Sequence, residues 1–201
     1  MNNFESICSD LIWAARRCYE SGMQTGNGGN FSARVPGKEQ MFVKASGMSF
    51  VEASESTIVR TDFSGTVISG QLKPSKESLL HGAIYRNNPL VNAIIHCHSP
   101  YATAWASTGQ SLPFATHHAA LKLKACVRVF DTESYAVPEA YFPQILSIFE
   151  DEPEAKAFLL RRHGAVAMGA TVREALFNAE LLEETARLAI LEIIIEKQLR
   201  P

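Results

Sequence analysis

Apolar positions near the amino terminus recur at helical spacing from Phe4 through Leu11 to Cys18, and Gly22 follows them. This period predicts an amphipathic helix that ends before the glycine. Between residues 30 and 68 the pattern changes to short runs rich in β-branched and aromatic residues, with Gly and Pro between them. These runs (FSARV, MFVKAS, TIV and TVI) predict a series of strands.

The middle of the chain combines both patterns. Ser75 is predicted to cap a helix that runs to about Asn87, because serine oxygens satisfy free amides at helix starts. The run AIIHCH at residues 93–98 predicts a buried strand. Pro100 suits the first turn of the helix expected after it.

The carboxy-terminal third predicts two strands and a long helix. AFLLRR and AVAM flank His163-Gly164 as two apolar strands around a tight turn. A capping box at residues 171–174 opens the helix. Its apolar stripe consists of Val172, Leu176, Ala179, Leu182, Ala186, Ala189 and Ile193. We therefore expect one mixed α/β domain over residues 1–201, built around a central and largely antiparallel sheet.

Composition restricts the partners and the compartment. The 201 residues, 46% hydrophobic and 20% charged, are typical of one globular domain. A net charge of −2 gives no field that would attract nucleic acid or an anionic membrane. The chain start lacks a signal-peptide pattern, and no apolar run is long enough to span a bilayer. The four cysteines form no CxxC pair, which fits reduced thiols, so a cytoplasmic location is expected.

His96 and His98 are the first candidate metal ligands. They are two residues apart in a predicted strand, so both side chains leave the same face while Cys97 points to the core. Two imidazoles on one face can chelate a zinc-like ion. The pair alone is equally compatible with a structural role.

His163 and Glu77 extend this set. His163 lies at the end of a predicted strand, beside a glycine that admits a close neighbour. Glu77 lies at a helix start, where a carboxylate interacts well with the helix dipole. Near a metal the same carboxylate could serve as a fourth ligand or as a general base. The sequence does not measure the distances between these residues, so both alternatives stay open.

Three short segments favour anion binding. Gly26-Asn27-Gly28-Gly29-Asn30 is a loop whose backbone amides can surround an anion, although its spacing is not that of a dinucleotide fingerprint. Ser46-Gly47 after a strand and Ser75-Lys76 at a helix start offer hydroxyls and free amides. Each segment is weak evidence alone, and together they suggest a phosphate pocket beside a metal.

The order of these motifs resembles the class II aldolase and adducin family, and within it the sugar-phosphate aldolases. The similar stretches are GNGGNFSARV, VKASG, KPSKE, IIHCHSPYATAWA, LLRRHGAVAMG and EALFNAELLEETARLA. They cover nearly the whole chain in order. The resemblance implies an α/β/α sandwich around a mostly antiparallel sheet, assembled as a homotetramer with active sites at subunit interfaces.

The same resemblance implies roles for individual residues. It implies Zn²⁺, or another divalent cation such as Mn²⁺ or Co²⁺, bound by His96, His98 and His163. Glu77 would be a resting-state ligand and then the base that transfers a proton. The phosphate of a small sugar would be held by Asn27, Gly28, Asn30, Ser46, Gly47 and Ser75.

Two positions depart from the aldolase pattern. His117, with His118 beside it, stands nearest the place of a tyrosine that acts as an acid across the subunit interface in the aldolases. Lys76 replaces a phosphate-binding serine, and KPSKE resembles the motif of family decarboxylases that act on 3-oxo-tetronate 4-phosphates. Lys76 could pair with a substrate carboxylate or could simply be solvated.

The resemblance therefore implies an aldehyde-lyase of carbohydrate metabolism that cleaves a ketose phosphate through a metal-stabilised enediolate. A 3-oxo-tetronate 4-phosphate-type decarboxylase on the same scaffold is the alternative, since it forms a similar enediolate by releasing carbon dioxide. A non-catalytic, adducin-like interaction module is a further alternative. The presence of all three histidines and Glu77 argues against that module.

Overall fold

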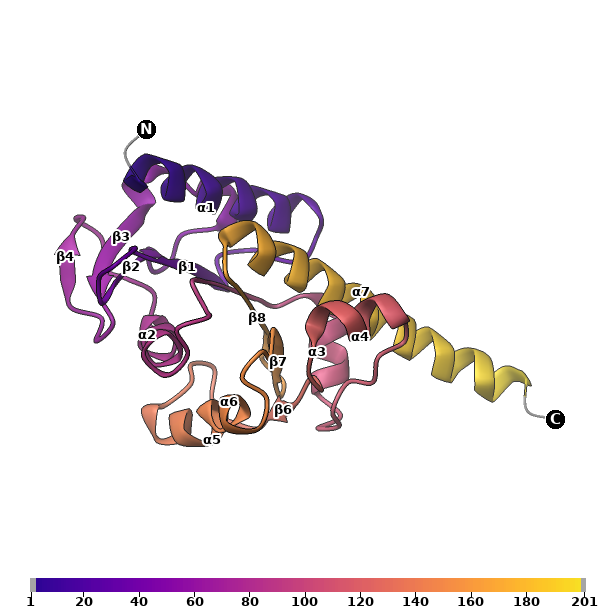
Figure 1. Cartoon of the computed structure of the whole chain (residues 1–201). Helices are drawn as coiled ribbons and strands as arrows, with labels where there is room; N and C mark the ends of the chain where they lie inside the picture. The colour runs from indigo at the N-terminus through magenta and orange to yellow at the C-terminus, as the bar shows by residue number, and fades with distance from the viewer. Residues whose placement is uncertain (1–2, 200–201) are drawn as a thin grey trace.

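An eight-stranded sheet forms the centre of the computed structural model, which describes residues 3–199 and the side chains from residue 5 onward (Figure 1). The strand order is β4-β3-β2-β1-β5-β8-β7-β6, and only β6 and β7 pair in parallel. The strands are β1 (Asn30–Arg34), β2 (Gln40–Lys44), β3 (Ile58–Asp62), β4 (Val67–Ser69), β5 (Ala93–Cys97), β6 (Val129–Phe130), β7 (Ala157–Leu160) and β8 (Gly164–Gly169). The predicted, mostly antiparallel sheet is confirmed.

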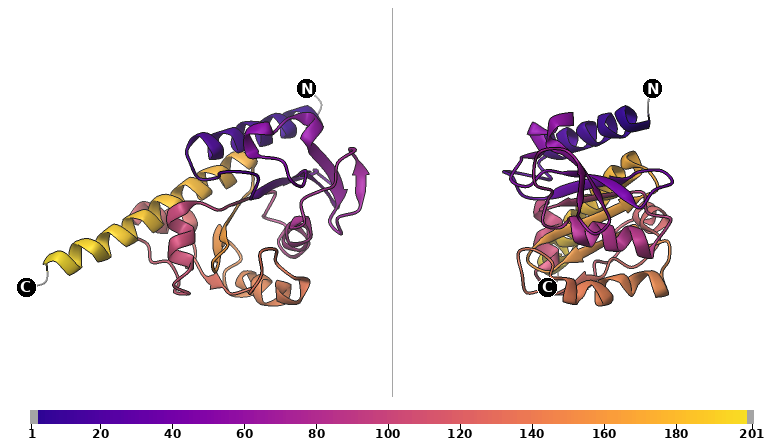
Figure 2. Two further views of the ribbon diagram at one scale, coloured as in Figure 1. Left: turned by 180° about the vertical axis from the view of Figure 1, so that it is seen from behind. Right: turned by 90° about the vertical axis from the view of Figure 1, so that its left-hand side faces the viewer.

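Helices cover both faces of the sheet, so the fold is the expected α/β/α sandwich (Figures 1 and 2). The helices are α1 (Asn3–Glu20), α2 (Ser78–Asn87), α3 (Pro100–Ala106), α4 (His117–Leu123), α5 (Phe142–Leu146), α6 (Ile148–Asp151) and α7 (Val172–Leu199), with short 3-10 turns at Phe50–Glu52, Glu55–Thr57 and Glu139–Tyr141. Alternate residues of β5 serve the two faces. Ile95 and Cys97 pack with α1, α3 and α7, while Ile94 packs with α2, α5 and α6. Phe4, the first apolar position of the predicted amino-terminal helix, lies outside the described side chains.

The prediction that Ser75 caps α2 is wrong. The helix begins at Ser78, with Glu77 at the capping position. Ser75 is instead attached to the end of β2, because its amide donates to the Lys44 carbonyl at 3.0 Å. The Ser46 amide donates to the Lys73 carbonyl at 2.8 Å. These bonds bring the two serine segments together, which local sequence patterns cannot specify.

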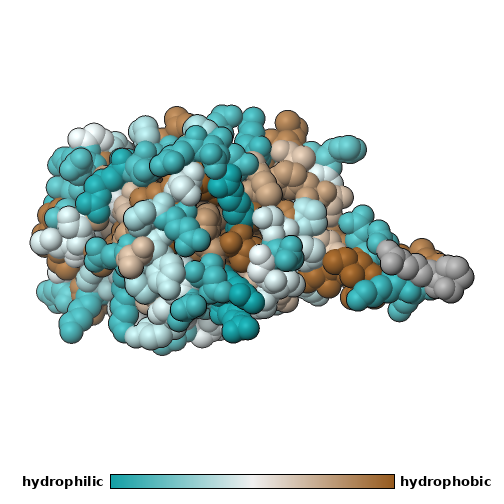
Figure 3. Space-filling view, turned by 90° about the horizontal axis from the view of Figure 1, so that it is seen from below, coloured by the Kyte–Doolittle hydropathy of each residue, from teal (hydrophilic) through white to brown (hydrophobic). Residues whose placement is uncertain are grey.

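Helix α7 begins as predicted, but its predicted apolar stripe is buried only in part. The Glu174 amide donates to Thr171 Oγ1 at 3.1 Å, whereas the Glu174 carboxylate accepts from the amide of Ala170 rather than from that of Thr171. The stripe is buried as far as Ala189, but Ile193 is 43% exposed because the helix runs past the edge of the sheet (Figure 1). Leu191, Ile194 and Ile195 are also exposed there. Figure 3 shows hydrophobic surface where this segment leaves the body.

The remaining local expectations agree with the structure. Pro100 occupies the first turn of α3, and residues 161–163 form the tight turn between β7 and β8. Cys8, Cys18 and Cys97 are buried, Cys126 is exposed, and all four are free thiols. None of the helices within residues 3–199 has both the length and the apolar character needed to cross a membrane.

Candidate metal and phosphate site

Three strand ends meet at one place in the sheet. Asn30, the first residue of β1, lies opposite His96 of β5, and His96 lies opposite Val166 of β8. His98 directly follows β5, and His163 directly precedes β8. The antiparallel pairing of β5 with β8 therefore brings together histidines that are 65 or more residues apart in the chain.

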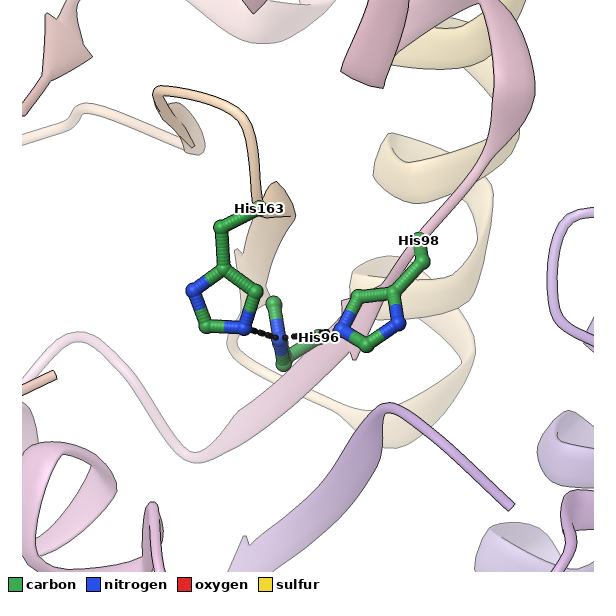
Figure 4. Close-up of side chains that lie close together, drawn as sticks. All are labelled: His96, His98 and His163. Carbon is green, nitrogen blue, oxygen red and sulfur yellow. Dashed lines mark hydrogen bonds between the residues drawn. The ribbon is translucent and has the colours of Figure 1, made fainter. Parts of the chain in front are cut away.

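The rings of His96, His98 and His163 turn toward a common point (Figure 4). The Nε2 atom of His96 lies 3.2 Å from the Nε2 atoms of both His98 and His163. In a tetrahedral zinc site with Zn–N bonds of 2.0–2.1 Å, ligand nitrogens are about 3.3 Å apart. The spacing of the three imidazoles thus fits a single divalent cation.

The charge state of the imidazoles also fits a cation. His96 Nδ1 donates to the carbonyl of Ala165 at 2.9 Å, which leaves its Nε2 lone pair facing the other rings. Burial, together with the neighbouring imidazoles, lowers the pKa of His96 to about 3 and that of His163 to about 4. Burial also lowers the pKa of His98. Neutral imidazole is the form that binds metals, so all three rings are ready to act as ligands.

Glu77 adds a carboxylate to this cluster from the start of α2. Its Oε2 lies 3.2 Å from His96 Nε2, and its Oε1 lies 3.6 Å from His163 Nε2. Asn30 Nδ2 donates to Oε2 at 2.7 Å, which fixes the carboxylate in the buried interior. The four side chains offer three nitrogens and one carboxylate oxygen, a donor set that suits zinc-like cations.

The glycine loop packs directly against the metal cluster. A Cβ atom on Gly28 would lie 2.7 Å from His98 Nδ1, and one on Gly29 would lie 2.7 Å from the His96 carbonyl. Gly29 also has a φ of 63°, which favours glycine. Gln24 holds the backbone of His98 in place, since its Oε1 accepts from the His98 amide at 2.8 Å. The close approach of the loop to these two histidines therefore leaves no room for a side chain at either glycine.

The predicted anion-binding residues line one cavity of about 310 Å³ together with His98, His163 and Glu77 of the metal cluster. Its walls contain Asn27, Gly28, Gly29, Asn30, Lys44, Ser46, Gly47, Ser75, Lys76, Glu77, His98, Tyr135, Ala136 and His163. Every residue that was expected to bind phosphate is in this list. The structure thus brings the segments predicted to bind phosphate and the side chains predicted to bind a metal into the same pocket.

Lys44 is a residue of this pocket that the sequence analysis missed. It is 2% exposed, and its Nζ donates to the carbonyls of Asn27, at 3.2 Å, and Met48. Burial lowers its pKa to about 8. The signal was a lysine within the apolar run at residues 41–45, since buried lysines normally have a specific partner. Tyr135 was also missed, because a tyrosine in a polar loop gives no comparable signal.

His117 and His118 do not line this cavity. Both begin α4 and are exposed, and Thr116 caps the helix by accepting from the Ala119 amide. His118 lines a larger cavity of about 650 Å³ between α4 and α7, away from the three clustered histidines. A role for His117 in the metal site would therefore require a neighbouring subunit.

The sandwich fold, the three imidazoles and the glycine loop define a protein of the class II aldolase type. Residues 9–190 match the model of the class II aldolase and adducin N-terminal domain, and the chain belongs to this family. Class II aldolases depend on a divalent cation, and the histidine cluster provides ligands for one.

Relatives of this chain include enzymes with three different reactions. An L-fuculose phosphate aldolase of Methanococcus maripaludis is 30% identical over 182 residues, covering 90% of this chain and 94% of that protein. A 3-oxo-tetronate 4-phosphate decarboxylase of Haemophilus influenzae is 33% identical over 182 residues, with coverages of 89% and 84%. An L-ribulose-5-phosphate 4-epimerase of Salmonella paratyphi B is 29% identical over 187 residues, with coverages of 90% and 82%.

Among solved structures, an L-fuculose 1-phosphate aldolase matches with a TM-score of 0.84 and 28% identity, covering 98% of this chain and 89% of that chain. All of these enzymes are named for phosphorylated substrates. These relatives are named as aldolase, decarboxylase and epimerase. The comparisons therefore identify the family of this chain but not its reaction.

Proposed function

We propose that this protein is a divalent-metal-dependent lyase that cleaves a ketose phosphate into dihydroxyacetone phosphate and an aldehyde. The observation that carries this proposal is the shared cavity, whose walls include His98, His163 and Glu77 together with the glycine loop and the two serine segments. A small substrate can therefore place its phosphate and its reacting carbonyl in one pocket. The convergence of these side chains also argues against a non-catalytic, adducin-like module.

His96, His98 and His163 would hold the cation, with Glu77 as the fourth ligand in the resting state. A bound divalent cation supplies Lewis-acid stabilisation of negative charge on the carbonyl and hydroxyl oxygens of the substrate. The imidazole-rich ligand set favours Zn²⁺, and Mn²⁺ and Co²⁺ are the alternatives.

Glu77 would then move the proton at the reacting carbon. After the carbon–carbon bond breaks, the enediolate must gain a proton at the carbon that lost its partner. Glu77 is suited to this transfer because its carboxylate lies beside the metal cluster and Asn30 holds one of its oxygens at 2.7 Å. General acid–base groups in such positions typically contribute factors of about 10² to 10⁴ in rate.

Phosphate binding by the glycine loop can be tested with Asn27→Ala. We expect the KM for a ketose phosphate to rise about 10-fold or more, the scale of one hydrogen bond to a charged group, while kcat stays within about twofold. Inorganic phosphate should compete with the substrate in the wild-type protein. Asn87→Ala, an exposed asparagine at the end of α2, is the matched control and should change neither constant. A fall in kcat at unchanged KM would show that Asn27 does not act in ground-state binding.

A decarboxylase is the second candidate, and Lys76 is the observation that favours it. Lys76 lines the cavity next to Glu77, and its ammonium has no carboxylate partner among the described residues. A substrate carboxylate would provide one. Such a substrate would lose carbon dioxide and yield a similar enediolate.

Lys76→Ser separates the two reactions. In an aldolase we expect cleavage to stay within about fivefold of wild type, the scale of a lost cation–π contact at an exposed site. In a decarboxylase the same change should abolish activity. The measurement incubates the metal-loaded protein with phosphorylated ketoses and with 3-oxo acid phosphates, and assays dihydroxyacetone phosphate and carbon dioxide separately. Release of carbon dioxide without dihydroxyacetone phosphate would reject the aldolase proposal.

We also propose that residues 1–201 form a single domain that assembles in the cytoplasm as a homotetramer with active sites at its interfaces. The exposed apolar residues at the end of α7, including Ile194 and Ile195, support an assembly that covers them. The absence of His117 from the lining of this cavity supports a partner subunit that completes the site. The four free thiols fit a reducing compartment.

A further inference from the structure

Tyr135 stands at the rim of the metal-site cavity without an assigned role. It lines this cavity together with His163 and Glu77, although 80% of its surface is exposed. The Nζ atom of Lys76 lies 5.4 Å from the centroid of its ring. The phenol therefore lies beside the chain segment that carries Glu77.

The loop of Tyr135 is attached to the turn of His163. Strands β6 and β7 are parallel, so the segments that follow them leave the sheet at the same edge. The Arg161 amide donates to the Phe130 carbonyl at 2.8 Å, and Arg161 Nη1 pairs with Asp131 Oδ2 at 2.7 Å. Both contacts join the Tyr135 loop to the residues immediately before His163.

Backbone strain indicates that tertiary contacts hold the Tyr135 loop against the turn of His163. Glu133 on one segment and Arg162 on the other have φ values of 49° and 53°, in the left-handed region that L side chains rarely adopt. Both residues line a second cavity of about 560 Å³, and Tyr135 lies between this cavity and the metal-site cavity. Strained conformations persist only where surrounding contacts hold them, and they gather at functional sites.

The proposed reaction needs one more proton-carrying group. In the condensing direction, the aldehyde oxygen becomes an alkoxide and must receive a proton. Glu77 is committed to the reacting carbon, and Lys44 Nζ already donates to two carbonyls. His117, to which the resemblance gives this task, is absent from the cavity of its own chain. Ser46 and Ser75 also carry hydroxyls in this cavity, but the proposed function assigns them to the phosphate. The remaining hydroxyl among the described residues of the cavity is that of Tyr135, which can both donate and accept.

We propose that Tyr135 is a catalytic residue that exchanges a proton with the aldehyde oxygen, an inference that rests on the proposed aldolase function. In condensation, the electron pair of the enediolate carbon forms the new bond to the aldehyde carbon. The carbonyl π pair moves onto the aldehyde oxygen, which takes the Tyr135 proton, and solvent water reprotonates the phenolate. Cleavage reverses these transfers. The Lys76 ammonium beside the ring stabilises the transient negative charge.

The test separates proton exchange at the reacting carbon, assigned to Glu77, from proton exchange at the aldehyde oxygen, assigned to Tyr135. Metal-loaded wild-type protein is incubated with dihydroxyacetone phosphate alone in D₂O, and loss of the carbon-bound proton is followed by NMR. We expect Tyr135→Phe to retain this exchange within about twofold while aldol cleavage and condensation fall about 10²-fold, the scale of a lost acid–base group. Bound metal and the KM for dihydroxyacetone phosphate should not change. Tyr101→Phe, which changes an exposed tyrosine on α3 that does not line the cavity, should leave every readout at wild-type values.

Three results would contradict the inference. Equal loss of deuterium exchange and cleavage in Tyr135→Phe would show a structural role. A selective loss of cleavage in His117→Ala, with normal cleavage in Tyr135→Phe, would assign the proton to a partner subunit. Absence of deuterium exchange in the wild-type protein would reject the aldolase proposal itself, and the inference with it. The first two results leave the aldolase proposal intact.

Discussion

Replacing His96 with alanine is expected to remove the metal and to lower kcat/KM by about 10³-fold or more. His96 is the central member of the cluster, since its Nε2 lies 3.2 Å from both other imidazole nitrogens and 3.2 Å from Glu77. Loss of one of three nitrogen ligands leaves too few donors for tight binding. The Lewis-acid contribution of the cation is several kcal/mol, and each 1.4 kcal/mol is about a factor of ten in rate.

The measurement is the metal content of the purified variant by atomic absorption, alongside its activity and its circular dichroism. His96→Gln is a second variant that keeps more of the buried volume, in case alanine destabilises the interior. His118→Ala is the matched control, because His118 is exposed and lines a different cavity. It should keep a full complement of metal. Full metal stoichiometry in a folded His96→Ala protein would contradict the proposed metal site.

Glu77→Gln is expected to lower kcat by about 10³-fold while the protein keeps its metal and its KM. Glutamine has nearly the same shape, so the contact with Asn30 can persist, but it cannot take up or return a proton at neutral pH. The three imidazoles remain to hold the cation. Removal of a general acid–base group costs about 10² to 10⁴ in rate, which sets the expected size of the effect.

Loss of deuterium exchange into dihydroxyacetone phosphate distinguishes this effect from that of Tyr135→Phe. Glu150→Gln, an exposed carboxylate at the end of α6, is the control and should exchange at the wild-type rate. If Glu77→Gln loses its metal, and added metal restores normal exchange, Glu77 acts as a ligand only. Another group would then have to be the base.

The secondary-structure features that depend on neighbouring residues could be predicted from the sequence. The period of two along β5 and the residue after it places His96 and His98 on one face and Cys97 in the core, because alternate residues of an extended segment point to opposite sides. The same reasoning gave the strands around the His163 turn and the start of α7 at the Thr171 capping position. Each of these features depends on contacts within a few residues, which a single sequence contains.

The sequence predicted each of the three candidate phosphate-binding segments separately. It did not predict that they come together in one cavity. Ser46 and Ser75 meet because residues 73–75 hydrogen-bond to the end of β2, which also moves the start of α2 to Ser78. Lys44 joins the site because the glycine loop and Met48 bring carbonyls to its ammonium. These contacts join segments far apart in the sequence, so the spacing of residues within one segment does not predict them.

Residue order was enough to predict the two-face alternation of the strands, the helix stripes and the candidate metal ligands, because side-chain period and residue chemistry are local properties. Which of these residues meet depends on how the chain folds. The fold placed Glu77 beside His96, brought Tyr135 to the rim through the parallel pairing of β6 with β7, and left His117 and Ile193 outside the site and the core. The physical reason is that distances between segments are set by sheet order and register, which emerge only when the whole chain packs around one sheet.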